Sequence, residues 1–242
     1  MSYYRTLIQQ ATTFVNLLVA AYKFENNGND SHTNGFNGTV GSAVIFSTTN
    51  AVDGSAGQFG SNTNSRITIA DNDAFSFTDG TNDKPFSIKA NIYYTQLGAI
   101  NPIFCRYSGS NNNTSEYLFY LRSNGKLALL LFNKASGGVY IGAETSAALV
   151  ANTAYNVVCT YSGSGSWTGI KLYVNGVSQT LSALNNGSGY TSMGNTTVTP
   201  TIGNSITNNN PFRGTIDELY VFNAELTPAQ ITTLQTNYYP NF

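Results

Sequence analysis

The chain is poor in charged side chains. Asp, Glu, Lys and Arg make up 10% of its 242 residues, whereas soluble proteins average about 25%. The eleven Lys and Arg residues are scattered singly, and the net charge is −1. Because binding to a phosphate backbone requires a clustered basic face, we expect no nucleic acid partner.

Cysteine is scarce as well. Cys105 and Cys159 are the only two, too few to define a disulfide framework, and the sequence does not decide whether they pair. Both end short apolar runs, which favours two buried thiols that pack as small hydrophobic groups. A chain of this length buries roughly two thirds of its unfolded surface, so folding requires neither a disulfide nor a metal.

Long hydrophobic runs are absent. No stretch approaches the ~20 apolar residues that cross a membrane, so we expect no membrane span. Residues 1–21 resemble a secretion signal only loosely, since polar residues interrupt the apolar stretch and the small-residue cleavage motif is missing. We therefore expect no cleavable signal peptide. Residues 17–24 are predicted as the first core strand, and residues 1–16 as an N-terminal arm or attachment segment.

The groups that catalysis needs are missing too. Retaining glycosidases use two carboxylates about 5–5.5 Å apart, whereas Asp217 and Glu218, as neighbours on a strand, should point to opposite faces. His32 is the only histidine and lies in a loop rich in Gly and Asn. No Gly-x-Ser-x-Gly motif accompanies it as a nucleophile. The sequence therefore indicates that the chain is not an enzyme.

Short apolar runs alternate with clusters of Gly, Asn and Ser along the whole chain. This pattern is typical of an all-β sandwich or barrel, and no linker or internal repeat divides it. We expect a single domain over residues 17–242. The candidate strands are 17–24, 42–46, 65–70, 85–94, 101–107, 116–123, 126–133, 138–143, 155–161, 169–175, 177–182, 199–203 and 213–223.

Two hairpins and one helix have clear local signals. Asn124-Gly125 and Asn175-Gly176 each separate two apolar runs, and Asn-Gly is the preferred pair for a two-residue type I′ turn. Near the C-terminus, Thr227 is followed by Pro and, three residues on, by Gln230. This arrangement predicts a helix N-terminus.

Residues 212–231 read FRGTIDELYVFNAELTPAQI. This segment resembles the closing segment of the laminin-G-like, concanavalin A-like jelly rolls, in which Gly-x-Ile-Asp-Glu opens an alternating strand that leads to a short helix. Tyr155-Asn156 departs from the family, which usually has Trp-His there. The resemblance implies a two-sheet antiparallel jelly-roll sandwich with a short C-terminal helix. It continues upstream in the segments 19–24, 66–69, 86–88, 155–161 and 171–176.

The resemblance also implies a calcium site. Relatives often hold Ca²⁺ between the loop after the first strand and the Asp of the Ile-Asp-Glu motif. Asn27, Asn29, Asp30 and Asp217 would supply the oxygen ligands that calcium prefers. Alternatively, Asp30 caps a turn by hydrogen bonding to the backbone, and Asp217 anchors the same loop directly.

A carbohydrate site would use aromatic rings and amides on loops. Trp167, the only tryptophan, lies in the loop 163–169, and Tyr107, Tyr190 and Asn112 lie in other loops. We take these four as candidate sugar-binding residues. The alternatives are that Trp167 covers the edge of the sandwich and that the Asn residues only form turns.

Together these features predict a non-enzymatic, surface-exposed carbohydrate-binding or adhesion module. A low-charge surface without a signal peptide or partner domains favours a virion component, such as a phage fibre or decoration protein. We expect it to be homo-oligomeric, extracellular or on the virion surface, and attached to virion proteins through residues 1–16. The alternative is a purely structural decoration protein without a glycan ligand, and a degraded glycosidase is a third.

Overall fold

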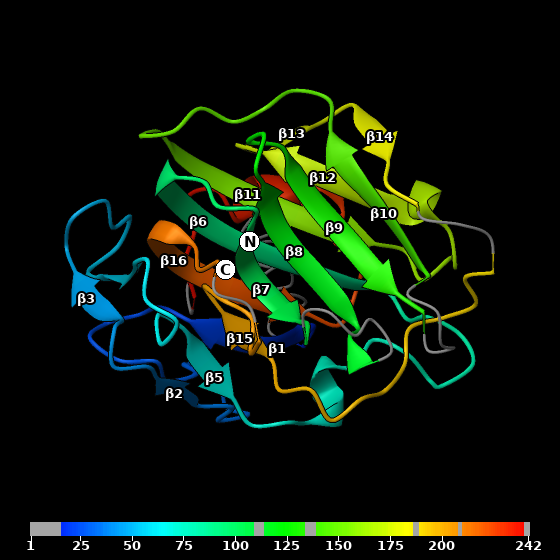
Figure 1. The fold of residues 1–242 in the computed structure, drawn as a ribbon, viewed down its shortest axis with the longest axis horizontal. Coiled ribbons are helices and arrows are strands. Elements are labelled where there is room, and N and C mark those ends of the chain that lie inside the picture. The colour runs from blue at the N-terminus through cyan, green and yellow to red at the C-terminus, as the bar shows by residue number, and fades with distance from the viewer. Residues whose placement is uncertain (1–15, 109–113, 134–138, 186–188, 208–209, 240–242) are drawn as a thin grey trace, which may run out of the picture.

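The structure is a computed structural model that describes residues 16–108, 114–133, 139–185, 189–207 and 210–239. It consists of two eight-stranded sheets, and all strand pairs are antiparallel. In Figure 1 the strands β7–β10 of one sheet lie in front of β6, β11, β12 and β16 of the other. The predicted all-β jelly-roll sandwich is therefore confirmed. The predicted arm lies almost entirely outside the described residues.

The first sheet has the order β13-β12-β11-β6-β16-β4-β3, with β1 also paired to β16. Its long central strands, β6 and β16, are joined along most of their length. The bounds of its strands are β1 (Leu18–Tyr22), β3 (Ile45–Ser47), β4 (Ala56–Phe59), β6 (Phe86–Gln96), β11 (Ala154–Tyr161), β12 (Ile170–Val174), β13 (Val177–Ser178) and β16 (Arg213–Phe222).

The second sheet has the order β14-β10-β9-β8-β7-β15-β5-β2. Two short 3-10 helices, η1 (Asp73–Phe75) and η3 (Trp167–Gly169), lie in the connections. The bounds of its strands are β2 (Gly38–Val40), β5 (Ile67–Ile69), β7 (Ile100–Arg106), β8 (Tyr117–Arg122), β9 (Leu127–Phe132), β10 (Tyr140–Thr145), β14 (Leu181–Ala183) and β15 (Thr201–Ile202).

The main core lies between the sheets and follows the two-residue period of the strands. In β8, Tyr117, Phe119 and Leu121 point into this core, whereas Leu118 and Tyr120 pack on the outer face of the second sheet. Cys159 belongs to the main core and Cys105 to the outer cluster. Both thiols are free and buried, as the sequence favoured.

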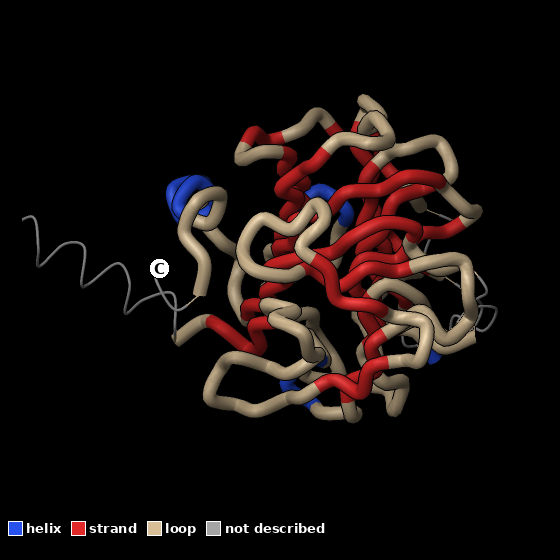
Figure 2. Tube along the Cα trace, turned by 90° about the vertical axis from the view of Figure 1, so that its left-hand side faces the viewer, coloured by secondary structure: helices blue, strands red, loops and turns tan. Residues whose placement is uncertain are grey.

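The predicted helix is present as α2 (Pro228–Thr233), and its capping box is formed by Thr227 and Gln230. The buried side chains of Ile231 and Leu234 attach it to the outer face of the first sheet. Figure 2 shows this helix outside the strand layers, close to the C-terminus. Among the residues that the structure describes, no helix has the length and hydrophobicity needed to cross a bilayer.

Both Asn-Gly hairpins form, but only one has the expected turn. Asn175 and Gly176 have φ of 49° and 73°, as a type I′ turn requires. In the other hairpin only Gly125 has a positive φ, and its N–H donates to the Arg122 carbonyl. The pairing of Arg122 with Lys126 leaves a three-residue loop. The prediction of a two-residue type I′ turn at Asn124-Gly125 is therefore wrong. The extra residue lets Asn124 keep the ordinary negative φ of a non-glycine residue.

The sequence did not predict strands correctly where the segment is not apolar, or where pairing with distant segments decides which sheet a residue joins. β2 and β4 were not predicted, because GTV and AGQF are too short or too polar to stand out. The predicted strand 177–182 is divided between β13 in the first sheet and β14 in the second. Gln179 and Thr180 carry the chain from one sheet to the other, which no local pattern reveals.

Gly214 in the FRGTIDE segment has a structural role that a substitution should reveal. Its φ is 150°, and an added Cβ would lie 1.9 Å from the Tyr93 carbonyl oxygen. We expect Gly214→Ala to lower the free energy of unfolding by about 1–3 kcal/mol, as measured by urea denaturation. Gly60→Ala is the matched control, since an added Cβ there meets nothing within 4 Å. Equal effects of the two substitutions would contradict this role.

Candidate functional site

One end of the sandwich is built around residues 189–193. On one side, Asn133 Oδ1 accepts hydrogen bonds from the Thr191 N–H and hydroxyl, both at 3.0 Å. On the other side, the Asp83 carboxylate accepts from the Tyr190 hydroxyl at 2.8 Å and from the Met193 N–H at 2.7 Å. Burial raises the pKa of Asp83, and these hydrogen bonds oppose the rise. The two polar anchors hold this segment in a defined position.

Trp167 is tied to the same segment. It opens η3 behind the cap residue Ser166 and is half-buried against the core. The Tyr161 hydroxyl donates to Asp83 at 2.7 Å and accepts from the Gly165 N–H at 2.7 Å. The loop that carries Trp167 and the segment that carries Tyr190 therefore share Asp83 as their anchor.

Tyr107 reaches this end from the second sheet. Its ring stacks on Phe132 with centroids 5.3 Å apart, and Phe132 also contacts the edge of Tyr140. Phe132 precedes Asn133, which holds the segment 189–193. Trp167 and Tyr190 pack against the main core, whereas Tyr107 packs in the outer cluster and is linked to the segment 189–193 only through Phe132 and Asn133. We call the end of the sandwich that carries these three rings the aromatic end. Asn112 lies outside the described residues.

Three of the proposed calcium ligands organise the loop after β1. Asp30 accepts backbone hydrogen bonds from Ala21 and His32 through Oδ1 and from Phe36 through Oδ2, at 2.8–3.0 Å. The Asn27 side chain accepts from the Asn29 N–H at 2.8 Å, which forms a local turn. The bond from His32 forms an Asx turn, whereas the bonds from Ala21 and Phe36 tie Asp30 to β1 and to the end of the loop.

Asp217 anchors a different loop. Its Oδ2 accepts from the Val52 N–H at 2.8 Å, and its Oδ1 accepts from the Glu218 N–H at 2.8 Å. Glu218 has a φ of 47°, and the pairing of β16 with β6 shifts between Asp217 and Tyr220. The bulge breaks strand alternation, so both acidic side chains reach residues 52–53. The expectation that they point to opposite faces is wrong for this reason.

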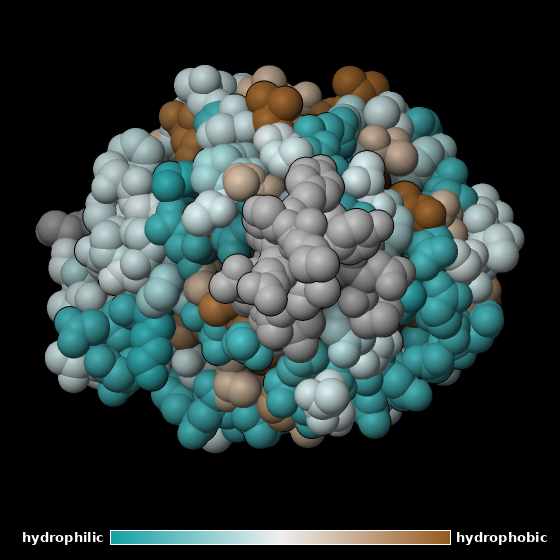
Figure 3. All heavy atoms as spheres, turned by 180° about the vertical axis from the view of Figure 1, so that it is seen from behind, coloured by the Kyte–Doolittle hydropathy of each residue, from teal (hydrophilic) through white to brown (hydrophobic). Residues whose placement is uncertain are grey.

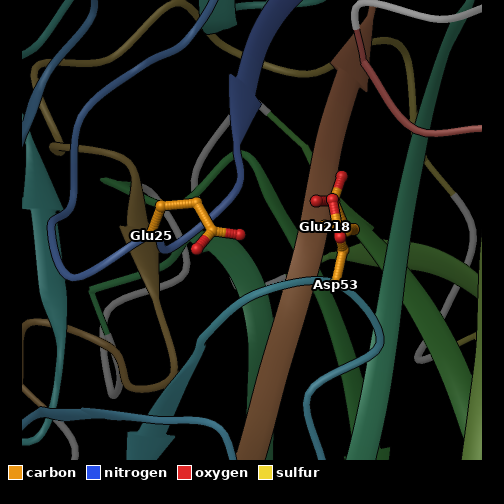
Figure 4. Close-up of side chains that lie close together, drawn as sticks. All are labelled: Glu25, Asp53 and Glu218. Atoms are coloured by element: carbon orange, nitrogen blue, oxygen red, sulfur yellow. The ribbon is translucent and has the colours of Figure 1, made fainter.

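The structure brings together three carboxylates that sequence reasoning missed. One oxygen each of Glu25, Asp53 and Glu218 lie within 4.8 Å of one another. Figure 4 shows them on the loop after β1, the loop before β4, and β16. We call these three residues the acid cluster. The only sequence signal for it was that Glu218 follows Asp217 in the family motif.

Glu218 gives the acid cluster its unusual electrostatics. Its side chain is fully buried, and neither carboxylate oxygen accepts a hydrogen bond. Burial raises the pKa of Glu218 to about 8, although the nearby Lys89 ammonium lowers it. Lys89 Nζ donates to the Glu218 backbone carbonyl at 3.0 Å and lies over the rings of Tyr220 and Tyr238. Two buried oxygens without donors fit a cation, and carboxylates are ligands that calcium prefers.

Residues 60–232 match the family described as the concanavalin A-like lectin/glucanases superfamily. The chain belongs to this superfamily. Its membership confirms the resemblance that the segment 212–231 indicated. No curated protein matches the sequence.

Solved structures share the superfamily fold at low sequence identity. Domain 4 of AbnA, an extracellular arabinanase from Geobacillus stearothermophilus, in complex with arabinotriose, is 18% identical with a TM-score of 0.64, and the match covers 90% of this chain and 98% of that one. The ligand-binding domain of botulinum neurotoxin serotype D, in complex with N-acetylneuraminic acid, is 15% identical with a TM-score of 0.64. That match covers 93% of this chain and 52% of the toxin domain, so the chain spans about half its length.

Proposed function

We propose that this chain is a non-catalytic carbohydrate-binding module. The observation that carries the proposal is that Asp83 anchors the loops of both Trp167 and Tyr190 at the aromatic end, with Tyr107 stacked on Phe132 in the outer cluster. Aromatic rings with a polar tip supply large, rigid contact areas for sugar rings. The fold relatives with arabinotriose and N-acetylneuraminic acid support the same class of ligand.

Two clefts among the described residues differ from a glycosidase site. A cleft of about 350 Å³ beside β1 and the start of β6 has Asp73 as the only acidic residue in its lining. A second cleft of about 190 Å³ is lined by no carboxylate. Glycoside hydrolysis needs two carboxylates facing one sugar ring, and neither cleft offers such a pair.

We also propose that the acid cluster binds Ca²⁺. Glu25, Asp53 and Glu218 would be its carboxylate ligands, and Asp217 would hold the loop that carries Asp53. The cation would neutralise the buried Glu218 and join the loop after β1 to β16. Lys23 Nζ, 3.6 Å from Asp53, neutralises part of the same charge.

We further propose that the chain is a surface-exposed adhesion module of a virion, attached through residues 1–16 and present as a homo-oligomer. The uncharged polar composition supports exposure to solvent. Figure 3 shows a mainly hydrophilic face on which hydrophobic residues are scattered rather than gathered. The alternative remains a structural decoration protein without a glycan ligand.

A glycan array with and without EDTA tests the binding proposal. We expect Trp167→Ala to weaken binding of the recognised glycan by about tenfold or more, because a stacked tryptophan is a typical binding hot spot. Tyr93→Ala is the matched control, since Tyr93 pairs with Ala154 at the opposite end of β11. Binding by neither the parent protein nor any variant would favour the structural alternative.

A further inference from the structure

A second polar cleft lies on the outer face of the first sheet, beneath the segment that follows α2. Its volume is about 190 Å³. One wall is the loop 50–52, which Asp217 holds through the Val52 N–H. The cleft is lined by Asn50, Val52, Asn91, Ile92, Ala154, Tyr155, Asn156, Gln235 and Tyr238.

Two buried asparagines form the floor of this cleft. Asn91 and Asn156 are direct partners on β6 and β11, and Asn156 Nδ2 donates to Asn91 Oδ1 at 3.0 Å. Their exposed fractions are only 6% and 9%. Asn156 Oδ1 nevertheless has no hydrogen-bond partner, whereas the Asn91 amide interacts with the Tyr238 hydroxyl. Buried amide groups almost always have partners, so this oxygen indicates a ligand.

The chemistry of this oxygen and of the residues around it defines that ligand. Asn156 Oδ1 is an acceptor, and a hydroxyl group of a ligand can donate a hydrogen bond to it. No charged side chain lines the cleft, whereas Asn50 and Gln235 add further amides and Tyr155 and Tyr238 add rings. This combination of amides and aromatic rings suits a neutral, polyhydroxylated molecule.

We propose that this cleft binds one neutral sugar residue through Asn91 and Asn156. The site lies beyond the proposed function, because it involves neither the aromatic end nor its residues. Tyr161 at the far end of β11 belongs to the aromatic end, whereas Asn156 lies near the start of that strand. The two sites would allow one chain to contact two sugar residues.

The experiment uses NMR of the full chain, with L-arabinose and D-galactose as neutral probes. We expect the side-chain amide signals of Asn91 and Asn156 to shift during titration. Ala154→Trp, at an exposed position on the rim, should block the cleft and weaken binding about tenfold or more without disturbing the core. Thr153→Trp is the matched control, because Thr153 is exposed and does not line the cleft.

Trp167→Ala separates this proposal from the glycan-binding proposal at the aromatic end. If this variant loses array binding but keeps the titration shifts, the two sites are independent, as proposed. If neither sugar shifts the two amide signals, water alone occupies the cleft and the inference is wrong. Equal affinities of Ala154→Trp and Thr153→Trp would also overturn it.

Discussion

Replacing Arg106 by Met is expected to lower the free energy of unfolding by about 3–5 kcal/mol. Arg106 ends β7 and is fully buried, and its Nε lies 3.2 Å from the carboxylate of Glu116, which is also fully buried. The guanidinium also donates to Ser76 Oγ and to the Thr196 carbonyl. Its removal leaves the Glu116 charge buried without its cation, and this penalty dominates the expected loss.

Urea denaturation with two further variants separates this effect from simple loss of a charge. Lys171→Met breaks the exposed pair with Glu225 and should cost less than about 1 kcal/mol. Arg106→Met combined with Glu116→Leu should recover much of the stability, because neither buried charge remains. If Arg106→Met lowers the free energy of unfolding no more than Lys171→Met does, the buried Arg106–Glu116 pair does not stabilise the protein.

Glu218→Gln is expected to make the protein insensitive to calcium and more stable in EDTA above about pH 8, where the parent carboxylate is ionised. The substitution removes a buried carboxylate whose oxygens have no hydrogen-bond donors. Calcium at a hundredfold excess over its Kd should stabilise the parent protein by about 2.7 kcal/mol. Thermal unfolding with calcium and with EDTA measures both effects. Glu225→Gln, outside the acid cluster, is the control and should keep the calcium response.

The same carboxylates should make stability depend on pH when calcium is absent. Burial raises the pKa of Asp217 to about 6 and that of Glu218 to about 8. The native state then holds protons that the unfolded state has released, so its stability falls as pH rises through these values. Burial lowers the pKa of Lys89 to about 7. Its contribution to stability is therefore lost as pH falls through that value, which opposes the effect of the two carboxylates.

Glu218→Gln should flatten the alkaline part of this profile, and Glu225→Gln should not. Calcium should also flatten it in the parent protein, since a bound cation keeps the carboxylates ionised. A parent protein whose stability is the same with calcium and with EDTA at every pH would contradict the metal proposal. That result would leave Glu218 as a buried, protonated side chain.

Local signals in the sequence predicted the elements that local interactions determine. The capping box of Thr227 and Gln230 and the turn at Asn175-Gly176 depend on residues within four positions of each other. In β8, alternate side chains face the main core and the outer cluster, which follows from the two-residue period of any strand. β4 has a sequence too polar to stand out, and it forms through a pairing with β16 that joins Gly57 to Ile216, a partner far away in the sequence.

The candidate sites also divide into features that local sequence predicts and features that only tertiary contacts create. The sequence by itself determined the sandwich, the superfamily and the aromatic residues available for sugar binding, because strand periodicity and a conspicuous closing segment are local properties. Only the tertiary structure decided that Glu25, Asp53 and Glu218 meet, and that Asn91 faces Asn156 in a cleft. These contacts depend on strand register and on the bulge after Asp217. The strand register and the bulge are set by packing between segments that are distant in the sequence, so no short stretch of sequence predicts them.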